Sequence, residues 1–126
     1  MPVTKCRLLT GAGNGIGLAA VENMLLNGAR VVAVDLKTEK LSSLKAHHDR
    51  QLEIITGDIS ERRTSELAVE AAVAKFQRLD CIVLNAGVLA PIGLVAETDV
   101  LAWKKLFDVN FFALLHTVCH SRLSVL

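Results

Sequence analysis

Four glycines occupy alternate positions immediately after the first apolar segment, and they constrain the fold more than any other feature of the chain. They are Gly11, Gly13, Gly15 and Gly17. The segment before them, Val3–Thr10, is a short β-branched run, and the segment after them, Gly15–Asn27, has helical spacing. Glycine permits positive φ and lets the backbone approach another group closely. The sequence therefore predicts a strand, a tight turn and a helix in direct succession.

The spacing of the turn is typical of one kind of phosphate-binding loop. The common pattern GxGxxG is not met, because Ile16 occupies its last position, whereas Thr-Gly-x-x-x-Gly-x-Gly is met from Thr10 onward. Such a turn directs free N–H groups and the positive end of the helix dipole toward a pyrophosphate. A glycine-rich turn without a ligand remains the alternative. The candidate binding residues here are Gly11, Gly13, Asn14, Gly15, Ile16 and Gly17.

Short apolar segments alternate with longer helical ones along the whole chain. The expected strands are Val3–Thr10, Ala29–Asp35, Leu52–Thr56 and Asp80–Asn85. The expected helices are Gly15–Asn27, Thr38–His48, Ser60–Gln77 and about Thr98–Ser121, with Gly28 ending the first, Ser60 capping the third and Thr98 or Asp99 capping the fourth. In the third helix, the residues expected near one side are Leu67, Ala71, Ala74 and Phe76. Strands that are apolar throughout are covered on both faces, so the pattern predicts an α/β fold, a parallel sheet with helices on both faces.

Asp35 ends the second expected strand about twenty residues after the glycines. A carboxylate at this place can accept both hydroxyls of an adenosine ribose and would repel a 2′-phosphate, which favours NAD over NADP. Leu36 beside it is a further candidate cofactor-binding residue. Lys37 is near enough to weaken the preference for NAD over NADP. A turn or helix-capping aspartate is the alternative interpretation. Together, the glycine turn and the aspartate indicate a Rossmann-type dinucleotide-binding domain over residues 1–126.

Composition excludes several other classes of protein. The formal net charge is +1 with no block of basic residues, which argues against a nucleic-acid partner. No apolar run reaches the roughly 20 residues that cross a bilayer, and no signal-peptide pattern is present, so we expect a cytoplasmic protein without a membrane partner. Three widely spaced cysteines without a CxxC pair predict reduced, mostly buried thiols and no metal site.

Three further motifs follow in order, and with the turn and Asp35 they resemble the compact short-chain dehydrogenase/reductase family. They are Gly57-Asp58-Ile59, Asn85-Ala86-Gly87 and Asp108-Val109-Asn110. The resemblance implies that Asp58 and Ile59 meet the adenine, that Asn85, Ala86 and Gly87 line the cofactor cleft, and that Asn110 is the structural and catalytic asparagine. Each also has a structural interpretation: a helix-capping aspartate, a strand-ending turn, and a buried amide that satisfies backbone groups.

The resemblance implies hydride transfer between NAD and a small-molecule alcohol or ketone, with a Ser, a Tyr and a Lys moving the proton. This chain has no tyrosine. We therefore expect a domain incomplete at its carboxyl terminus, truncated after about four strands in the order 3-2-1-4. We expect it to hold the cofactor site and to be inactive alone.

Three other interpretations stay open. The chain could be a dinucleotide-binding module without turnover, or a non-functional truncated product. A methyltransferase shares the glycine loop and the acidic residue, but the asparagine motifs argue against it.

His116 and His120 are four residues apart on the fourth expected helix but lack a third ligand, so a metal role is disfavoured. The apolar helix around Trp103–Leu115 could pair with a second copy, as in the family.

Overall fold

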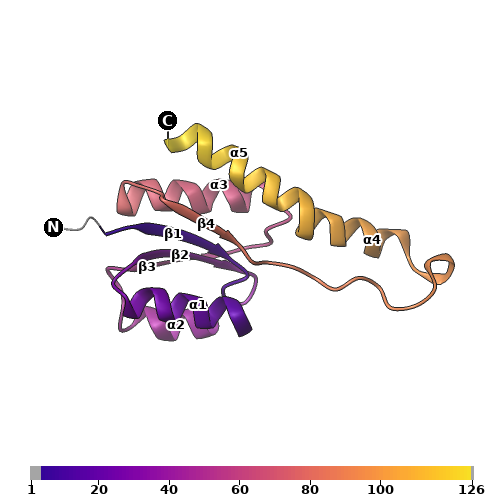
Figure 1. Ribbon diagram of the computed structural model, residues 1–126, viewed down its shortest axis with the longest axis horizontal. Helices are drawn as coiled ribbons and strands as arrows, with labels where there is room; N and C mark the ends of the chain where they lie inside the picture. Colours follow the sequence, from indigo (N-terminus) through magenta and orange to yellow (C-terminus); the bar gives the residue numbers. More distant parts are fainter. Residues whose placement is uncertain (1–3, 126) are drawn as a thin grey trace.

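The computed structural model describes residues 4–125, with side chains to residue 122, as a four-stranded parallel sheet with helices on both faces (Figure 1). The strand order is β3-β2-β1-β4, which confirms the expected fold class and order. The expected strand residue Val3 lies outside the described residues. The strands are β1 Cys6–Thr10, β2 Arg30–Asp35, β3 Leu52–Thr56 and β4 Cys81–Leu84.

Two hydrophobic clusters hold the layers together, one on each face of the sheet. Helices α1 (Gly15–Leu26) and α2 (Glu39–Lys45) cover one face, and α3 (Arg62–Ala71) and α5 (Ala113–Val125) lie over the other (Figure 1). The first cluster contains Leu9, Ala12, Val21, Leu25, Val31, Ala33, Leu41 and Leu52. The second contains Cys6, Leu8, Val32, Val34, Ile59, Ala68, Val69, Ala72, Phe76, Val109 and Ala113. Alternate residues of β1 and β2 thus enter opposite clusters, as strands buried on both faces require.

Gly28 ends the first helix as expected. Its φ of 78° is a left-handed conformation that suits glycine. The amide of Gly28 donates to the carbonyl of Leu25 at 3.0 Å, and that of Ala29 donates to Met24 at 3.0 Å. This pair of bonds is a Schellman motif, which satisfies carbonyls at the end of α1 and turns the chain into β2.

The third helix differs from its predicted bounds and face. It begins at Arg62 rather than after a Ser60 cap, and its last turn, η1 (Ala72–Phe76), is π-helical. Of the predicted face, Leu67 and Ala74 are exposed, so the prediction was wrong for these two residues. Phe76 is buried in the core and Ala71 packs against it, as expected. The buried residues of α3 are Thr64, Ser65, Ala68 and Val69. Because α3 packs against both the sheet and α5, its buried surface includes small polar residues that an apolar pattern overlooks.

The fourth predicted helix is three consecutive segments in the structure. A short 3₁₀ turn, η2 (Val95–Glu97), precedes α4 (Val100–Phe107), and a π-helical turn, η3 (Asp108–Phe112), joins α4 to α5. The side chain of Asp99 accepts a hydrogen bond from the Leu101 amide at 3.0 Å, which confirms it as the cap. Figure 1 shows α4 and α5 as one long rod whose α5 end lies over α3.

Exposure of the thiols corrects one expectation from composition. Cys6 is buried in the sheet, whereas Cys81 and Cys119 are exposed, so the thiols are not mostly buried. Cys81 begins the edge strand β4, where one flank has no neighbouring strand among the described residues. Burial, with a smaller contribution from nearby Asp80, raises the pKa of the Cys6 thiol to about 11. Among residues 4–125, no helix has the length and apolar character that crossing a membrane requires.

Candidate functional site

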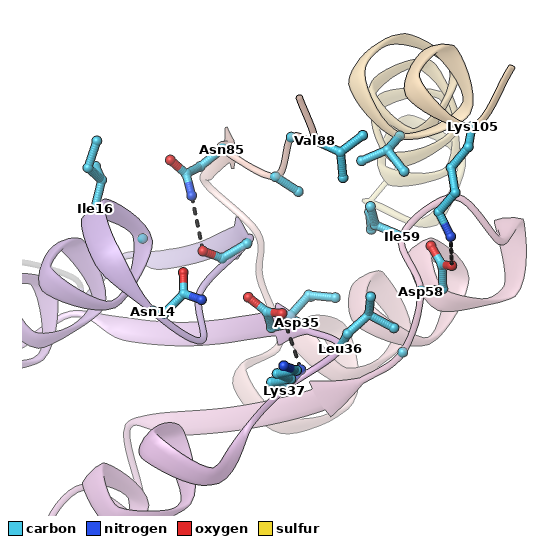
Figure 2. A pocket seen from close by; sticks show the side chains of 17 residues that line it. Asn14, Ile16, Asp35, Leu36, Lys37, Asp58, Ile59, Asn85, Val88 and Lys105 are labelled. Carbon is cyan, nitrogen blue, oxygen red and sulfur yellow. Dashed lines mark hydrogen bonds and ion pairs between the residues drawn. The ribbon is translucent and has the colours of Figure 1, made fainter. Parts of the chain in front are cut away.

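A cleft of about 470 Å³ opens at the carboxyl ends of the strands. This is the edge at which ligands of open parallel sheets bind. Figure 2 shows that the glycine turn forms one side, Asp35 and Leu36 the floor, and the start of the β4–α4 segment and α4 the other side. The cleft is lined by Gly11, Asn14, Ile16, Gly17, Val34, Asp35, Leu36, Lys37, Gly57, Asp58, Ile59, Asn85, Ala86, Gly87, Val88, Lys105 and Val109.

The glycine turn is compact because two of its residues adopt positive φ and three, Gly11, Gly13 and Gly17, have no room for a side chain. The φ angles of Gly11 and Gly15 are 69° and 51°. A Cβ atom on Gly17 would lie 2.0 Å from the carbonyl oxygen of Gly11, so the start of α1 packs directly on the turn. Gly13 and Gly15 do not line the cleft; they shape the turn that does. Within residues 4–125, no side-chain bond caps α1 at Asn14. The first N–H groups of a helix have no intrahelical acceptor, so those of α1 remain available to a ligand.

Asp35 is held against the glycine turn. Its Oδ2 accepts a hydrogen bond of 2.8 Å from the Gly13 amide, and its Oδ1 accepts one of 3.2 Å from the Lys37 amide. These bonds orient the carboxylate at the end of β2, where it also lines the cleft. The glycine turn and Asp35, which the sequence analysis identified separately, therefore form one hydrogen-bonded unit.

Asp58 lies in the turn after β3. Its carboxylate accepts hydrogen bonds from Ser60 within this turn and does not cap α3. Oδ1 accepts from the Ser60 amide at 2.9 Å and from the Ser60 hydroxyl at 2.7 Å. Oδ2 lies 3.8 Å from the ammonium of Lys105 on α4. The Ser60 hydroxyl, then the Ser60 amide and then the Lys105 charge lower the pKa of Asp58 below its usual range. An ionised carboxylate thus stands at this end of the cleft.

Asn85 ties the end of β4 to the glycine turn. Its side-chain amide donates to the carbonyls of Thr10 and Gly11 at 3.2 and 3.1 Å. The buried Thr10 hydroxyl in turn accepts from the amides of Asn85 and Ala86 at 3.2 and 3.1 Å. This reciprocal arrangement satisfies polar groups where two parallel strands end, and it places Ala86 and Gly87 at the cleft.

Asn110 makes a paired contact with the backbone of one residue across the cleft wall. Its Oδ1 accepts from the Val88 amide at 2.8 Å, and its Nδ2 donates to the Val88 carbonyl at 2.8 Å. Asn110 does not itself line the cleft; it holds the segment that does. The side-chain amide thus satisfies backbone groups, which is the structural interpretation given above for Asn110. The asparagine lies in the π-helical turn η3 between α4 and α5.

Several cleft residues were absent from the sequence-based candidates. Val34 and Gly57 adjoin motif residues, and Val88 directly follows Asn-Ala-Gly, so proximity to a motif was the signal. Lys105 is the least expected, since no motif contains it. It lies four residues before Val109, and residues at this spacing share one face of a helix.

The histidine pair on α5 gathers no further ligands. Within residues 4–122, no cluster of three His, Cys, Asp or Glu side chains could hold a metal ion. His116 is half-buried, and its Nδ1 is buried without a hydrogen-bond partner in this part of the chain. His120 contributes to lowering the pKa of Glu66, after the hydrogen bonds that Glu66 receives from Arg63 and Arg62.

Comparison with known proteins agrees with this geometry. The sequence model of the short chain dehydrogenase family matches residues 5–122. An uncharacterized oxidoreductase of Schizosaccharomyces pombe is 42% identical over 115 residues, which are 90% of this chain and 45% of the relative. The 3beta-hydroxysteroid dehydrogenase 2 of Eggerthella lenta is 35% identical over 112 residues, 86% of this chain and 43% of that one. The chain spans about half the length of the curated relatives it matches.

Solved structures show the same relationship. The KRED1-Pglu enzyme is 34% identical with a TM-score of 0.89, and the match covers 97% of this chain and 52% of that one. A short-chain dehydrogenase/reductase of Saccharomyces cerevisiae is 35% identical with a TM-score of 0.90, covering 96% and 49%. Because the family model matches nearly the whole chain and these neighbours share both sequence and fold, the chain belongs to the short chain dehydrogenase family.

Proposed function

We propose that the cleft binds NAD, with the pyrophosphate at the glycine turn and the adenosine ribose at Asp35. The observation that carries this proposal is the 2.8 Å bond between the Gly13 amide and the Asp35 carboxylate. It supports a site in which a phosphate-binding turn and a hydroxyl acceptor are fixed relative to each other. The residues fit the cofactor: the start of α1 has no side-chain cap within residues 4–125, and Gly17 has no space for a Cβ beside Gly11.

Asp35 is also the basis for choosing NAD over NADP. A carboxylate accepts hydrogen bonds from ribose hydroxyls and repels a 2′-phosphate, while the exposed Lys37 partly offsets that repulsion. Calorimetric titration of the chain with NAD and with NADP tests this preference. Asp35→Asn is expected to weaken NAD binding about tenfold by loss of a charged acceptor, and Lys37→Met is expected to widen the preference for NAD. Equal affinity for both cofactors in the unaltered chain would contradict the assignment.

The proposed chemistry is that of the family, hydride transfer between NAD and an alcohol or ketone. The nicotinamide ring supplies the hydride acceptor or donor when bound. In this chain, the start of α1 binds phosphate, Asp35 orients the ribose, and Asn110 holds the Val88 backbone at the cleft wall. The sequence contains no tyrosine, so it cannot supply the family's tyrosine for the proton transfer. We therefore propose that these 126 residues bind NAD, in the cytoplasm, without turning over an alcohol.

Two measurements separate this proposal from the remaining interpretations. Saturable NAD binding without NAD-dependent alcohol oxidation by the purified chain would support a binding unit. Oxidation of any alcohol would refute the statement that the chain is inactive alone. If the chain is folded, as judged by circular dichroism, but binds neither dinucleotide, the result would favour the interpretation of the chain as a non-functional truncated product.

The α4–α5 rod supports a second copy as a partner. It exposes a series of large apolar side chains, and monomeric proteins rarely leave large apolar patches open to water. We propose that two chains pair through this rod. The exposed side chains are Val100, Leu101, Phe107, Phe111, Phe112, Leu115 and Val118. Sedimentation equilibrium is expected to show a dimer that Phe111→Lys converts to a monomer; a monomeric unaltered chain would contradict this pairing.

A further inference from the structure

The α4–α5 rod carries a row of exposed side chains along its length. Residues three and four apart share one side of a helix, and this spacing runs from Leu101 to Arg122. Lys105 and Val109, which line the cleft, are not part of the row, so a partner could cover the row and leave the cleft open. The exposed members of the row are Leu101, Lys104, Phe111, Leu115, Val118 and Arg122.

The row is symmetric in sequence about a point between residues 109 and 110. Leu101 and Val118 lie equally far from that point, and so do Glu97, which precedes α4, and Arg122. In a two-fold dimer each residue of such a pair contacts its counterpart in the other copy, and the reverse contact forms as well. A two-fold axis at this point would therefore place apolar Leu101 against Val118 of the partner subunit. The same axis would place acidic Glu97 against basic Arg122 of the partner subunit.

Glu97 and Arg122 are charges without a partner at opposite ends of the rod (Figure 1). Both side chains are exposed, and within residues 4–122 neither belongs to an ion pair. The other charged groups near the start of α4 are already engaged. Lys104 pairs with Asp108 at 2.6 Å, and Asp99 caps the helix. The acid at one end and the cation at the other are thus complementary and available.

A cavity beside Arg122 offers room for the turn that carries Glu97. The cavity has a volume of about 350 Å³, and Arg122 lines it together with apolar Leu79 and Ile82. Val95, two residues before Glu97 in η2, is 77% exposed. When Glu97 meets Arg122 of the partner subunit, Val95 lies beside this apolar lining. Its removal from water favours the same arrangement as the charges.

We propose that two copies of the chain lie antiparallel along their rods, with Glu97 of each copy bound to Arg122 of the partner subunit. This inference rests on the proposed pairing of two chains through the rod, and it assigns the register that the pairing alone leaves open. The two ion pairs lie at the ends of the interface, and apolar contacts such as Leu101 with Val118 of the partner subunit lie between them. Charged groups at the rim of an apolar patch fix register and exclude shifted alignments.

Charge reversal with sedimentation equilibrium on the full chain tests the ion pairs. Glu97→Arg and Arg122→Glu are each expected to weaken the dimer roughly 10- to 100-fold, because two attractions per dimer become repulsions. The double variant restores opposite charges and is expected to return to within about threefold of the unaltered chain. At about 1 M salt the differences should largely disappear. Glu22→Arg, an exposed position on α1 at the other face of the sheet, is the matched control and should leave the dimer unchanged.

Disulfide trapping tests the register independently of charge. Val100 and Cys119 are exposed and also equally far from the point between residues 109 and 110, so the register places them opposite each other across the interface. In a Cys81→Ser background, Val100→Cys is expected to give a covalent dimer on mild oxidation, since facing positions come within the reach of a disulfide. Lys104→Cys, about one helical turn further along, is the control and should give little covalent dimer.

The outcomes separate this register from the pairing on which it rests. If the unaltered chain forms a dimer that Phe111→Lys disrupts, but neither charge reversal weakens it, the register is overturned and the pairing stands. A double variant that is weaker than both single variants also overturns it. If only Arg122→Glu has an effect, Arg122 acts within its own helix end, and the inference fails. A monomeric unaltered chain refutes both proposals. Circular dichroism of each variant establishes that the fold is intact.

Discussion

The amide of Gly13 donates a hydrogen bond of 2.8 Å to the carboxylate of Asp35, which joins the glycine turn after β1 to the end of β2. The two residues are so close that a Cβ on Gly13 would lie 2.9 Å from the Asp35 carboxyl carbon and 2.0 Å from the Lys37 carbonyl oxygen. The geometry of the turn and the direction of the carboxylate therefore depend on each other.

Gly13→Ala is expected to disturb both halves of the site. The clash is with backbone, which cannot move away easily, so the free energy of unfolding is expected to fall by about 3 kcal/mol, the upper part of the range for overpacking. Amide resonances of Asp35 and Lys37 should shift strongly in nuclear magnetic resonance spectra.

Gly15→Ala is the matched control for this substitution. Gly15 has a φ of 51° but nothing within 4 Å of its missing Cβ, so only backbone strain of about 1–2 kcal/mol is expected. The Asp35 and Lys37 resonances should stay nearly unchanged. Equal spectral changes in the two alanine variants would show that the Gly13 contact is not specific.

Asn110→Leu is expected to free the backbone of Val88. Both bonds of 2.8 Å are lost, and the unfolding free energy is expected to fall by about 1 kcal/mol, the low end for an unpaired group, because Val88 is partly exposed. Hydrogen exchange at the Val88 amide should accelerate more than at Leu101, whose amide bonds to Asp99. Unchanged protection of Val88 would mean that another group holds this segment.

Asp80, directly before β4, is expected to make the free energy of unfolding depend on pH. Hydrogen bonds from Arg78, and then from the Cys6 amide at 2.8 Å, lower the pKa of Asp80 to about 2 from 3.8. A carboxyl with a lower pKa in the folded state adds stability above the unfolded pKa and loses it as pH falls through the folded one. The stability difference between the unaltered chain and Asp80→Asn should be full above about pH 5 and shrink between about pH 4 and pH 2. Urea unfolding across this range is the measurement.

Asp49→Asn serves as the control for that titration. The Asp49 side chain is 80% exposed and lies 3.9 Å from Lys45, so its replacement should have little effect at neutral pH. A difference for Asp80→Asn that does not change with pH would contradict the role of its charge.

The contact between α3 and α5 includes a buried pair of hydroxyls whose energies should not add. Ser65 and Thr117 are 3.0 Å apart, and Thr117 also donates to the Ala113 carbonyl. Thr117→Val leaves the buried Ser65 hydroxyl without its partner and is expected to cost about 1–3 kcal/mol. The double variant with Ser65→Ala should be less destabilised than the sum of the single variants, because no hydroxyl is left unpaired. Strict additivity in urea unfolding would contradict this coupling.

Some features of the chain were open to prediction because their causes are local. The glycine turn, the stop at Gly28 and the Asp99 cap each depend on a backbone conformation or a bond within a few residues. The bounds of α3 were not predicted correctly, since Ser60 binds back to Asp58 instead of capping the helix.

The sequence by itself determined the alternation of strands and helices, the place of the glycine turn and the position of Asp35 at a strand end, because residue type and spacing control these directly. Only the tertiary structure decided that Gly13 binds Asp35, that Asn110 holds Val88, and that Lys105 stands beside Asp58. Each of these pairs is separated by more than twenty residues. Periodicity says which side of a helix is apolar, but the partner of a polar side chain depends on how whole elements pack together.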